Sequence, residues 1–231
     1  MATADKPDKP TGRAQVVAAM LEHAADLFAE RGPAATSTRE IAARAGINQA
    51  LIFRHFGSKE QLVGAVLDDL AAQAVAARHA DTAAAGTDGP NIEGMLAGVL
   101  PPGYPEEEAS VRAINSKHRQ VLARALLDGY PVGRLQRQFP GVSELIEVTR
   151  ARIDDDTDAR LAAASVVALV LGWQMFGPFI RSAATVDDVP YGRIRQAIET
   201  AITGILDSAG HDAGQHSDPD AEPTARGSID Q

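Results

Sequence analysis

Apolar side chains recur along most of this chain at the spacing of an α-helix. Between residues 13 and 31 they fall at Val17, Leu21, Ala24 and Phe28, and a Gly-Pro pair ends the pattern. The same spacing predicts further helices at 38–45, 49–56, 59–80, 91–100, 106–127, 133–152, 154–183 and 189–208. No segment alternates apolar and polar residues for long enough to predict a strand. We therefore expect an all-α protein.

Local start and stop signals divide the first third of the chain into three short helices and one long helix. Ser37 and Glu40 have the spacing of a capping box, in which each residue bonds the backbone of the other. Gly46 can supply a left-handed turn after the second helix, and Asn48 is a favourable N-cap for the third. Gly57 is expected to end that third helix before the long one begins.

Proline, glycine and polar residues also mark the rest of the chain. Pro140 should interrupt 133–152, and Gly177-Pro178 should kink the long apolar helix. The polar residues 1–12 and 210–231 are expected to be a disordered arm and tail. There is no cysteine, which excludes disulfides and thiolate metal sites. We find no signal segment and no uncharged apolar run of about 18 residues, so we expect a cytoplasmic protein without a membrane partner.

Charge is spread unevenly along the chain. The net charge is −9, yet residues 1–65 hold 8 Lys/Arg against 7 Asp/Glu, whereas the remainder holds 14 against 24. The segment 31–60 is basic, because it holds only two acidic residues against five basic ones, Arg31, Arg39, Arg44, Arg54 and Lys59. An acidic protein can bind a polyanion through one basic face while the rest of its surface repels non-specific contact. The distribution therefore permits nucleic acid binding.

The segment 38–56 has the arrangement of a helix-turn-helix. In this arrangement a helix, a glycine turn and a second helix place the N-terminus of the second helix in the major groove of DNA. An ordinary helical hairpin has the same spacing, so a helical scaffold that only contacts other proteins is the alternative. The scaffold alternative predicts that substitution of Arg39, Gln49 and Lys59 leaves DNA behaviour unchanged.

The residues within this segment resemble those of one regulator family. The stretch ATSTREIAARAGINQALIFRHFGSKEQL resembles the DNA-binding segment of the TetR family of transcriptional regulators. The matches include Arg39, Ile41-Ala42, Ala45-Gly46, His55-Phe56 and Gly57-Ser58-Lys59. The resemblance covers residues 13–65 and implies a three-helix DNA-binding domain there. It further implies a larger helical ligand-binding and dimerisation domain at 66–209, and hence a ligand-responsive regulator, most often a repressor.

The resemblance also implies positions that contact DNA, and side-chain chemistry agrees with most of them. The amide of Gln49 can pair with adenine, and Arg39 can reach a guanine or a phosphate. Thr38 offers a hydroxyl and a backbone N–H to phosphate, and Ala50 can meet a thymine methyl. The full set is Thr38, Arg39, Asn48, Gln49, Ala50, Leu51, Phe53, Arg54, His55 and Lys59.

Two of these positions depart from the family pattern. Phe53 stands where tyrosine is usual, so a hydroxyl–phosphate bond is absent and ring packing or a sugar contact remains. Leu51 replaces a small or hydroxyl residue, and either packs inward or contacts a methyl group. Ile52 and Phe56 are expected in the core. Both departures leave the recognised DNA sequence open.

The family implies a homodimer formed by the last two long helices. Their small residues, such as Ala164, Ala168 and Gly204, permit close approach, and Val166, Val170, Ile198, Ile202 and Ile205 supply apolar area. The same stripes can instead close the core of one subunit.

A pocket for a small apolar effector is also implied in the larger domain. Its candidate lining residues are Met95, Val99, Ile114, Asn115, His118, Leu122, Phe139, Trp173 and Phe176. Trp173 and Phe176 share a helix face with Ile180, and such a stripe is equally typical of core packing. His118 and Asn115 are the residues that can orient a ligand.

An enzyme is the competing class of function. We find no glycine-rich phosphate loop, no nucleophile elbow and no paired-histidine zinc motif. The acidic runs at 106–108 and 154–156 are typical of solvated helix starts, and His211 and His216 lie in the polar tail. We therefore expect no catalytic residues, metal site or cofactor.

Overall fold

The computed structural model describes residues 12–84 and 109–212 of the chain. Within these ranges every regular element is a helix, which confirms the all-α prediction. The helices are α1 Arg13–Arg31, α2 Thr38–Arg44, α3 Gln49–Phe56, α4 Lys59–Ala84, α6 Ala109–Leu127, α7 Val132–Leu135, α8 Pro140–Arg150, α9 Asp156–Ala183 and α10 Tyr191–Asp212. The expected helix at 91–100 and the expected disordered ends at 1–12 and 210–231 fall wholly or mostly outside the described residues.

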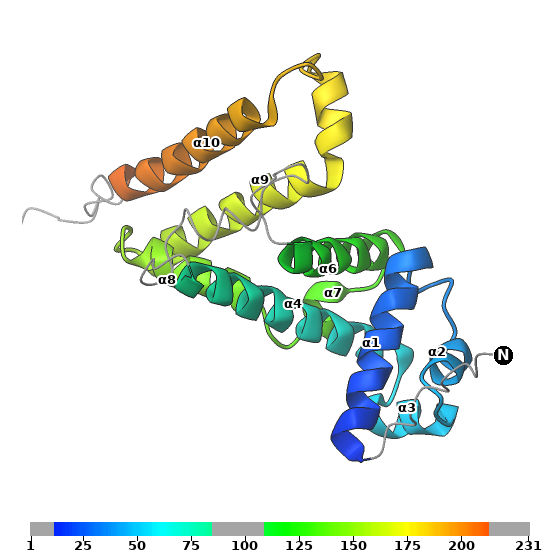
Figure 1. Ribbon diagram of the computed structural model, residues 1–231. Coiled ribbons are helices and arrows are strands. Elements are labelled where there is room, and N and C mark those ends of the chain that lie inside the picture. Colours follow the sequence, from blue (N-terminus) through cyan, green and yellow to red (C-terminus); the bar gives the residue numbers. More distant parts are fainter. Residues whose placement is uncertain (1–11, 85–108, 213–231) are drawn as a thin grey trace, which may run out of the picture.

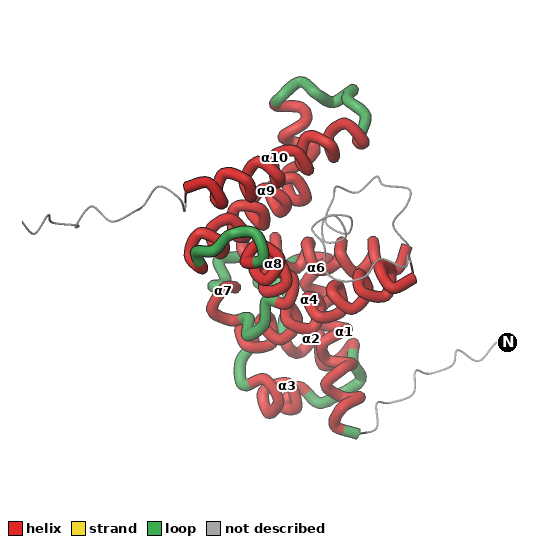
Figure 2. Tube along the Cα trace, turned by 90° about the vertical axis from the view of Figure 1, so that its left-hand side faces the viewer, coloured by secondary structure: helices red, strands yellow, loops and turns green. Residues whose placement is uncertain are grey.

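The helices form an elongated molecule with distinct ends (Figures 1 and 2). The short helices α1, α2 and α3 gather at one end, together with the start of α4. The remainder of α4 packs with α6, α7 and α8 in the middle, and α9 and α10 lie at the far end. Because α4 crosses the boundary expected after residue 65 without a break, the two parts of the chain share one helix.

The first core joins α1, α2, α3 and α4, and residues of α6 and α7 complete it. Met20, Phe28, Ile41, Ile52 and Leu62 are fully buried in it, at 0% exposure. These residues fall on the apolar stripes of their helices, so the helical spacing in the sequence places them all on one side. Burying each such side chain stabilises the fold by roughly 1.5–3 kcal/mol. The core also confirms the inward position of Ile52.

A second core joins α8, α9 and α10. Alanines and β-branched residues fill it, among them Ala163, Val166, Val170, Ile198 and Ile202. These apolar residues were candidates for the dimer surface, but four of them, Val166, Val170, Ile198 and Ile202, are buried within the subunit itself. The alternative, in which the stripes close the core of one subunit, therefore applies to them.

Proline positions acted as the sequence predicted. The segment 133–152 divides into α7 and α8, and Pro140 is the first residue of α8, where its missing N–H costs no bond. Pro178 lies inside α9, which bends sharply in its yellow portion (Figure 1). The ring of a proline removes a backbone hydrogen bond and clashes with the preceding turn, so it explains the bend.

The apolarity of α9 exceeds the sequence expectation. Residues 161–180 carry no charge, and among the described residues α9 is long and apolar enough to cross a membrane by length and composition. The expectation that no segment reaches that threshold was wrong, because interspersed serine, glutamine and glycine lower the mean hydropathy only slightly. Only 22% of its most apolar window is buried in the subunit. α9 therefore leaves a large apolar surface exposed.

Candidate nucleic acid interface

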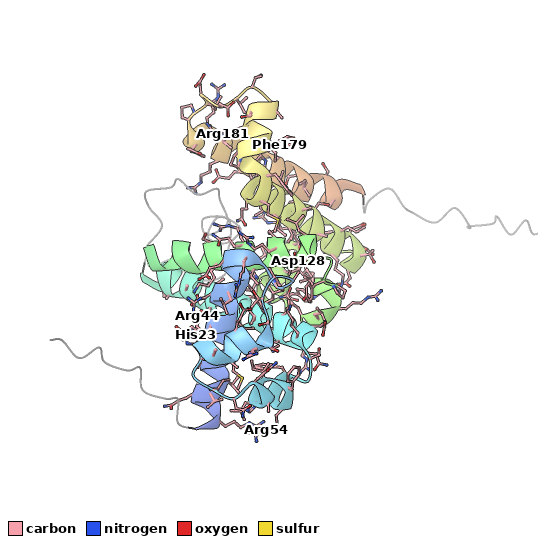
Figure 3. The ribbon with its side chains drawn as sticks, turned by 90° about the vertical axis from the view of Figure 1, so that its right-hand side faces the viewer. His23, Arg44, Arg54, Asp128, Phe179 and Arg181 are labelled. Atoms are coloured by element: carbon pink, nitrogen blue, oxygen red, sulfur yellow. The ribbon has the colours of Figure 1, made fainter. Side chains whose placement is uncertain are left out.

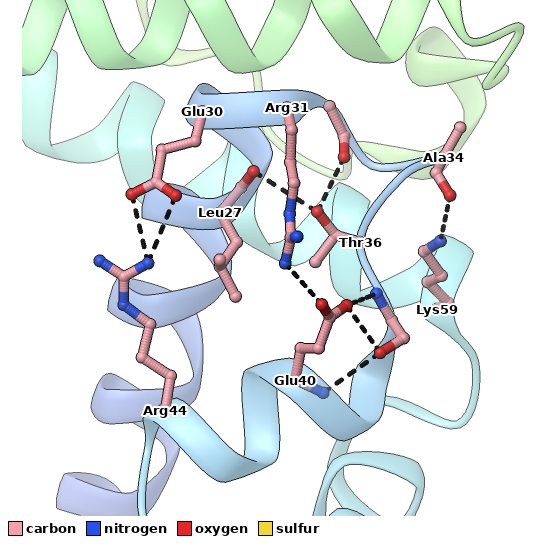
Figure 4. A network of polar contacts seen from close by, with 10 residues as sticks. Leu27, Glu30, Arg31, Ala34, Thr36, Glu40, Arg44 and Lys59 are labelled. Carbon is pink, nitrogen blue, oxygen red and sulfur yellow. Dashed lines mark hydrogen bonds and ion pairs between the residues drawn. The ribbon is translucent and has the colours of Figure 1, made fainter.

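The turn from α1 into α2 is fixed by a compact polar network (Figure 4). The Ser37 backbone N–H donates to Glu40 Oε2 over 2.8 Å, and the Glu40 N–H donates back to Ser37 Oγ over 3.2 Å, which confirms the capping box. The buried Thr36 hydroxyl donates to the carbonyl of Gly32 over 2.9 Å. The backbone and hydroxyl of Ser37, followed by the nearby guanidinium of Arg31, hold the pKa of Glu40 below its ordinary value.

Two of the basic residues in the motif serve the fold. Arg31 pairs with Glu40 over 2.9 Å, and Arg44 pairs with Glu30 over 3.2 Å and with Asp26 over 4.0 Å. Figure 4 shows both arginines turned towards these carboxylates, between α1 and α2. The charges of both arginines are therefore neutralised by neighbouring carboxylates. The sequence alone did not distinguish these two arginines from the other basic residues of the motif.

The remaining cations of the motif lie at the starts of α2 and α4 and near the end of α3. Arg39 at the start of α2 and Arg54 near the end of α3 are exposed and make no ion pair with the described residues. Lys59 is the first residue of α4, and its Nζ lies 3.5 Å from the carbonyl oxygen of Ala34. Because a helix N-terminus carries partial positive charge, the Lys59 ammonium and the backbone there favour an anion together.

The start of α3 is well defined. Gly46 adopts a φ of 66°, so the left-handed turn predicted after α2 is present. Asn48 caps the helix, because its side chain accepts a hydrogen bond from the N–H of Ala50 over 2.9 Å. Gln49 Nε2 donates to Thr38 Oγ1 over 2.8 Å. The two helices therefore meet at their N-termini, as a helix-turn-helix requires.

The predicted contact residues differ in exposure. Arg39, Asn48, Ala50, Phe53 and Arg54 are exposed. The half-buried members are Gln49, Leu51, His55 and Lys59, and Thr38 is buried. Leu51 and Phe56 both pack partly against the first core, so the inward alternative holds for Leu51. Phe53 borders a shallow hollow that Thr38 and Lys59 also line.

Sequence reasoning missed one basic residue near these contact residues. Arg13 begins α1 and lines a hollow of about 460 Å³ together with Leu51, Arg54 and His55. It is exposed and makes no ion pair with the described residues. Its position at the start of the predicted first helix was the available signal, but only the packing of α1 beside α3 brings it to Arg54.

Two polar contacts tie this unit to α6. Lys117 Nζ lies 2.6 Å from Asp26 on α1, and Asp128 accepts a hydrogen bond from the N–H of Ala34 over 2.7 Å. Gly32 adopts a φ of 85°, which strains any L side chain, and a Cβ there would also lie 2.9 Å from Asp128 Oδ2, so glycine suits this position. Figure 3 shows Asp128 in the middle of the molecule, between Arg54 at one end and Arg181 at the other.

A cavity of about 480 Å³ lies among α4, α6, α7, α8 and α9. His118, Leu122 and Phe139 line it, as the sequence predicted for a ligand pocket. Trp173 instead packs against the second core, and Phe176 is 56% exposed. Met95, Val99 and the side chains of Ile114 and Asn115 lie outside the described residues.

His118 is the most perturbed group of the cavity. Its pKa is lowered from 6.5 to about 4, because burial disfavours the charged imidazole and Arg119 adds a like charge. The imidazole is therefore neutral at physiological pH. The described residues contain no group of three or more His, Cys, Asp or Glu side chains arranged to hold a metal ion.

Known proteins resemble this chain along most of its length. Residues 20–66 match the family described as bacterial regulatory proteins, tetR family. The HTH-type transcriptional repressor Rv3405c of Mycobacterium tuberculosis is 45% identical over 203 residues, which are 88% of this chain and 95% of the repressor. The HTH-type transcriptional repressor KstR2 of Mycolicibacterium smegmatis is 46% identical over 63 residues, which are 27% of this chain and 31% of KstR2.

Among solved structures, the chain is similar to BioQ of Mycobacterium smegmatis, at 19% identity and a TM-score of 0.49 over 87% of this chain and 99% of BioQ. The long match to Rv3405c spans the helix-turn-helix and the larger helical part alike. This chain therefore belongs to the TetR family and is a DNA-binding transcriptional regulator.

Proposed function

We propose that the chain is a homodimeric repressor that binds a palindromic operator and is released by a small, mainly apolar effector. The observation that carries the DNA part is the sorting of cations in the helix-turn-helix. Arg31 and Arg44 are neutralised by carboxylates, whereas Arg39, Arg54 and Lys59 lie on the face formed by the starts of α2 and α4 and by α3. Phosphates are the natural partners of these remaining charges.

The residues of this face divide into two roles. Gln49 and Arg39 are the base-contacting candidates, because both lie at helix starts where an amide or guanidinium can reach base edges. Arg54, His55 and Lys59 are the phosphate contacts. Ala50 is exposed and leaves room for a thymine methyl group, and Asn48 is the cap that fixes the helix start.

The exposed surface of α9 and α10 supports the proposed two-fold dimer. Leu161 is 60% exposed and borders a groove with Ala201, Gly204 and Ile205 of α10. Apolar side chains beside small residues form a surface on which a second copy of the helices can pack closely. The dimer presents two recognition helices to a palindrome, which supplies the specificity that a single short helix lacks.

The effector is proposed to occupy the cavity beside α6. None of the described lining residues is acidic, so a cationic ligand would find no counter-charge. Arg78 is already paired with Glu144. His118 and Gln136 line the cavity and make no side-chain hydrogen bond with the described residues. An uncharged, mainly apolar molecule with a hydroxyl or carbonyl group fits these features best.

The release mechanism runs through α6. His118 faces the cavity, while its neighbour Lys117 is paired with Asp26 of α1. Asp128 at the end of α6 holds the backbone of Ala34 just before α2. A ligand that binds more tightly to one position of α6 shifts the population of dimers, and thus the spacing of the two recognition helices.

Selection of bound duplexes from a random DNA pool tests the operator and the dimer together. The expected result, at near-physiological salt, is a palindrome with half-sites about one helical turn apart. Binding without sequence preference, or no binding, would favour a helical scaffold instead. The selected duplex then serves as the probe for all later experiments. The regulator is proposed to act in the cytoplasm.

Substitution of single cations tests the phosphate contacts. Lys59→Ala and Arg54→Ala should each weaken binding to every sequence and lower the salt slope by about one unit. Arg44→Ala is the matched control, because this arginine is committed to Glu30 and should leave the slope unchanged. An unchanged slope in the Lys59 variant would contradict its assignment.

Ligands of equal length and different charge test the cavity. We expect 1-decanol to raise the melting temperature and release the operator at lower concentration than decylammonium. The variant Gln136→Leu should weaken the decanol response while leaving operator binding intact. Equal or stronger release by decylammonium would contradict the proposed ligand class.

A further inference from the structure

The side chain of Gln49 is tied to the helix that precedes it. Its amide Nε2 donates a hydrogen bond to Thr38 Oγ1 over 2.8 Å. Thr38 is the first residue of α2 and Gln49 the first residue of α3, so the bond joins two helix starts across the glycine turn. Thr38 is 8% exposed and lines the shallow hollow that Phe53 and Lys59 also border.

Thr38 offers Gln49 a fixed partner. The capping box formed by Ser37 and Glu40 holds the first turn of α2, and the branched side chain of threonine restricts its own rotation. An unrestrained glutamine amide can turn by about 180° and present either its oxygen or its NH₂ group to the same base. The bond to Thr38 restricts where this amide lies, and in the orientation observed the nitrogen is the atom that faces Thr38.

We infer that Thr38 is a positioning residue for base recognition, which holds the Gln49 amide at the start of α3 where it can pair with adenine. The inference rests on the proposed contact between Gln49 and a base. With one N–H bound to Thr38, the amide keeps its oxygen and its other N–H for DNA. This acceptor and donor match N6 and N7 of adenine, whereas guanine presents two acceptors, O6 and N7, in the same groove.

This role differs from the phosphate contact that the sequence predicted for the Thr38 hydroxyl. The Thr38 oxygen accepts a hydrogen bond from Gln49, and its O–H can still donate to another acceptor. The exposed Arg39 and the backbone of the α2 start remain available for phosphate. The two assignments differ in what they predict: a positioning role alters base preference, and a phosphate contact alters affinity for all sequences.

Two substitutions at position 38 separate these roles. Thr38→Val exchanges the hydroxyl for a methyl group of similar size, and Thr38→Ser keeps the hydroxyl. Binding is measured to operator duplexes that carry adenine or guanine at the base pair affected by Gln49→Ala. We expect Thr38→Val to lower the adenine-over-guanine ratio about tenfold, as for loss of one base contact, with an unchanged salt slope. Thr38→Ser should keep the ratio within about twofold.

An unchanged base ratio in Thr38→Val would overturn the inference, as would a uniform loss of affinity with a lower salt slope. Helicity and melting temperature are compared first, and Thr38→Ala takes the place of Thr38→Val if the valine variant does not fold. In a Gln49→Ala background, Thr38→Val should cause no further change in base preference, because the group that it positions is gone.

The variants also separate this inference from the proposed function. If Gln49→Ala alters no base preference, the proposed base contact of Gln49 itself fails. If Gln49→Ala alters the preference and Thr38→Val does not, the contact stands and only the positioning role of Thr38 is wrong. Loss of preference in both variants, with Thr38→Ser unaffected, is the result that supports the inference.

Discussion

The two cores of this protein are built differently. The core of α1 to α4 buries large side chains completely, including Met20 and Phe28 at 0% exposure. The core of α8 to α10 is made mainly of alanine, valine and isoleucine with two leucines, and the same helices leave Leu161 and Phe179 at 60% and 72% exposure. One apolar region is closed within the subunit, and the other is open on one side.

This difference separates what each region needs. A closed core stabilises the DNA-binding unit without a partner, because its apolar area is already removed from water. The open region gains most of its remaining stability only when a second surface covers it. The family fold therefore combines a unit that is complete in one subunit with a unit suited to assembly, and the predictions below test that division.

The largest effect is expected from a charge placed in the open region. Ala201 of α10 is exposed and lines the groove beside Leu161. Ala201→Glu would bury one unpaired carboxylate from each subunit, at several kcal/mol per ion, or about 6 kcal/mol for the dimer. Analytical ultracentrifugation should show a monomer of 24.3 kDa in place of the dimer.

The control for this experiment is Gln196→Glu, which adds the same charge at an exposed position on another part of α10. It should leave the dimer intact. A dimeric Ala201→Glu variant would mean that the subunits associate through a different surface. A monomeric variant that retains helicity would show that the closed core stands without a partner.

The closed core gives the next largest effect. Phe28 of α1 is fully buried in the first core. Phe28→Ala removes a large apolar group and leaves a cavity, so we expect the free energy of unfolding to fall by about 3–5 kcal/mol. Urea denaturation measures the loss. A cost below about 1 kcal/mol would contradict the view that this core is tightly closed.

The closed region is also the part that the sequence predicted best. The capping box of Ser37, the turn at Gly46 and the cap at Asn48 act on neighbouring residues, so their spacing in the chain already determines the geometry. The cations were harder to interpret. Arg44 and Arg54 look alike in sequence, and only the approach of α1 to α2 neutralises one of them.

The cavity shows where sequence patterns cease to be informative. Periodicity indicates that α9 has apolar faces, but several helices compete for them. Val166 and Val170 touch both the cavity and the second core, whereas Phe176 of the same helix is exposed. Which face meets which helix depends on long-range packing and on the bend at Pro178, and neither is encoded locally.

The stability of the protein is expected to depend on pH through His118, which lines the cavity among α4, α6, α7, α8 and α9. His118 titrates near pH 4 when folded and near 6.5 when unfolded, so between these values the unfolded chain binds the additional proton. Stability should therefore fall as the pH drops from 6.5 to 4, by at most about 3 kcal/mol. His118→Gln should reduce this acid sensitivity, measured as the free energy of unfolding against pH.

Leu122→Met alters the same cavity wall without a titratable group, so its pH dependence should match that of the parent chain. An unchanged slope in His118→Gln would mean that other groups cause the acid sensitivity. The acid sensitivity depends on burial of the His118 imidazole. Its size therefore also reports whether the cavity around His118 stays closed to water.

The smallest effect is expected at the edge of the closed region. Ser37→Ala removes the cap of α2, which should cost about 1 kcal/mol at neutral pH. It also removes the hydroxyl bond to Glu40, so the pKa of that carboxyl should rise towards its ordinary value. Because Glu40 has a lowered pKa in the folded chain, its contribution is present above pH 4.5 and is lost as the pH falls below it.

Unfolding experiments at pH 7 and pH 3 distinguish the two contributions of Ser37. The Ser37→Ala variant should differ more from the parent chain at pH 7 than at pH 3, because the contribution of the Glu40 carboxylate is lost as the pH falls through its lowered pKa. Ser37→Asp restores a capping side chain and should recover most of the loss at pH 7. An equal difference at both pH values would mean that the cap acts on the helix alone, without the carboxylate of Glu40.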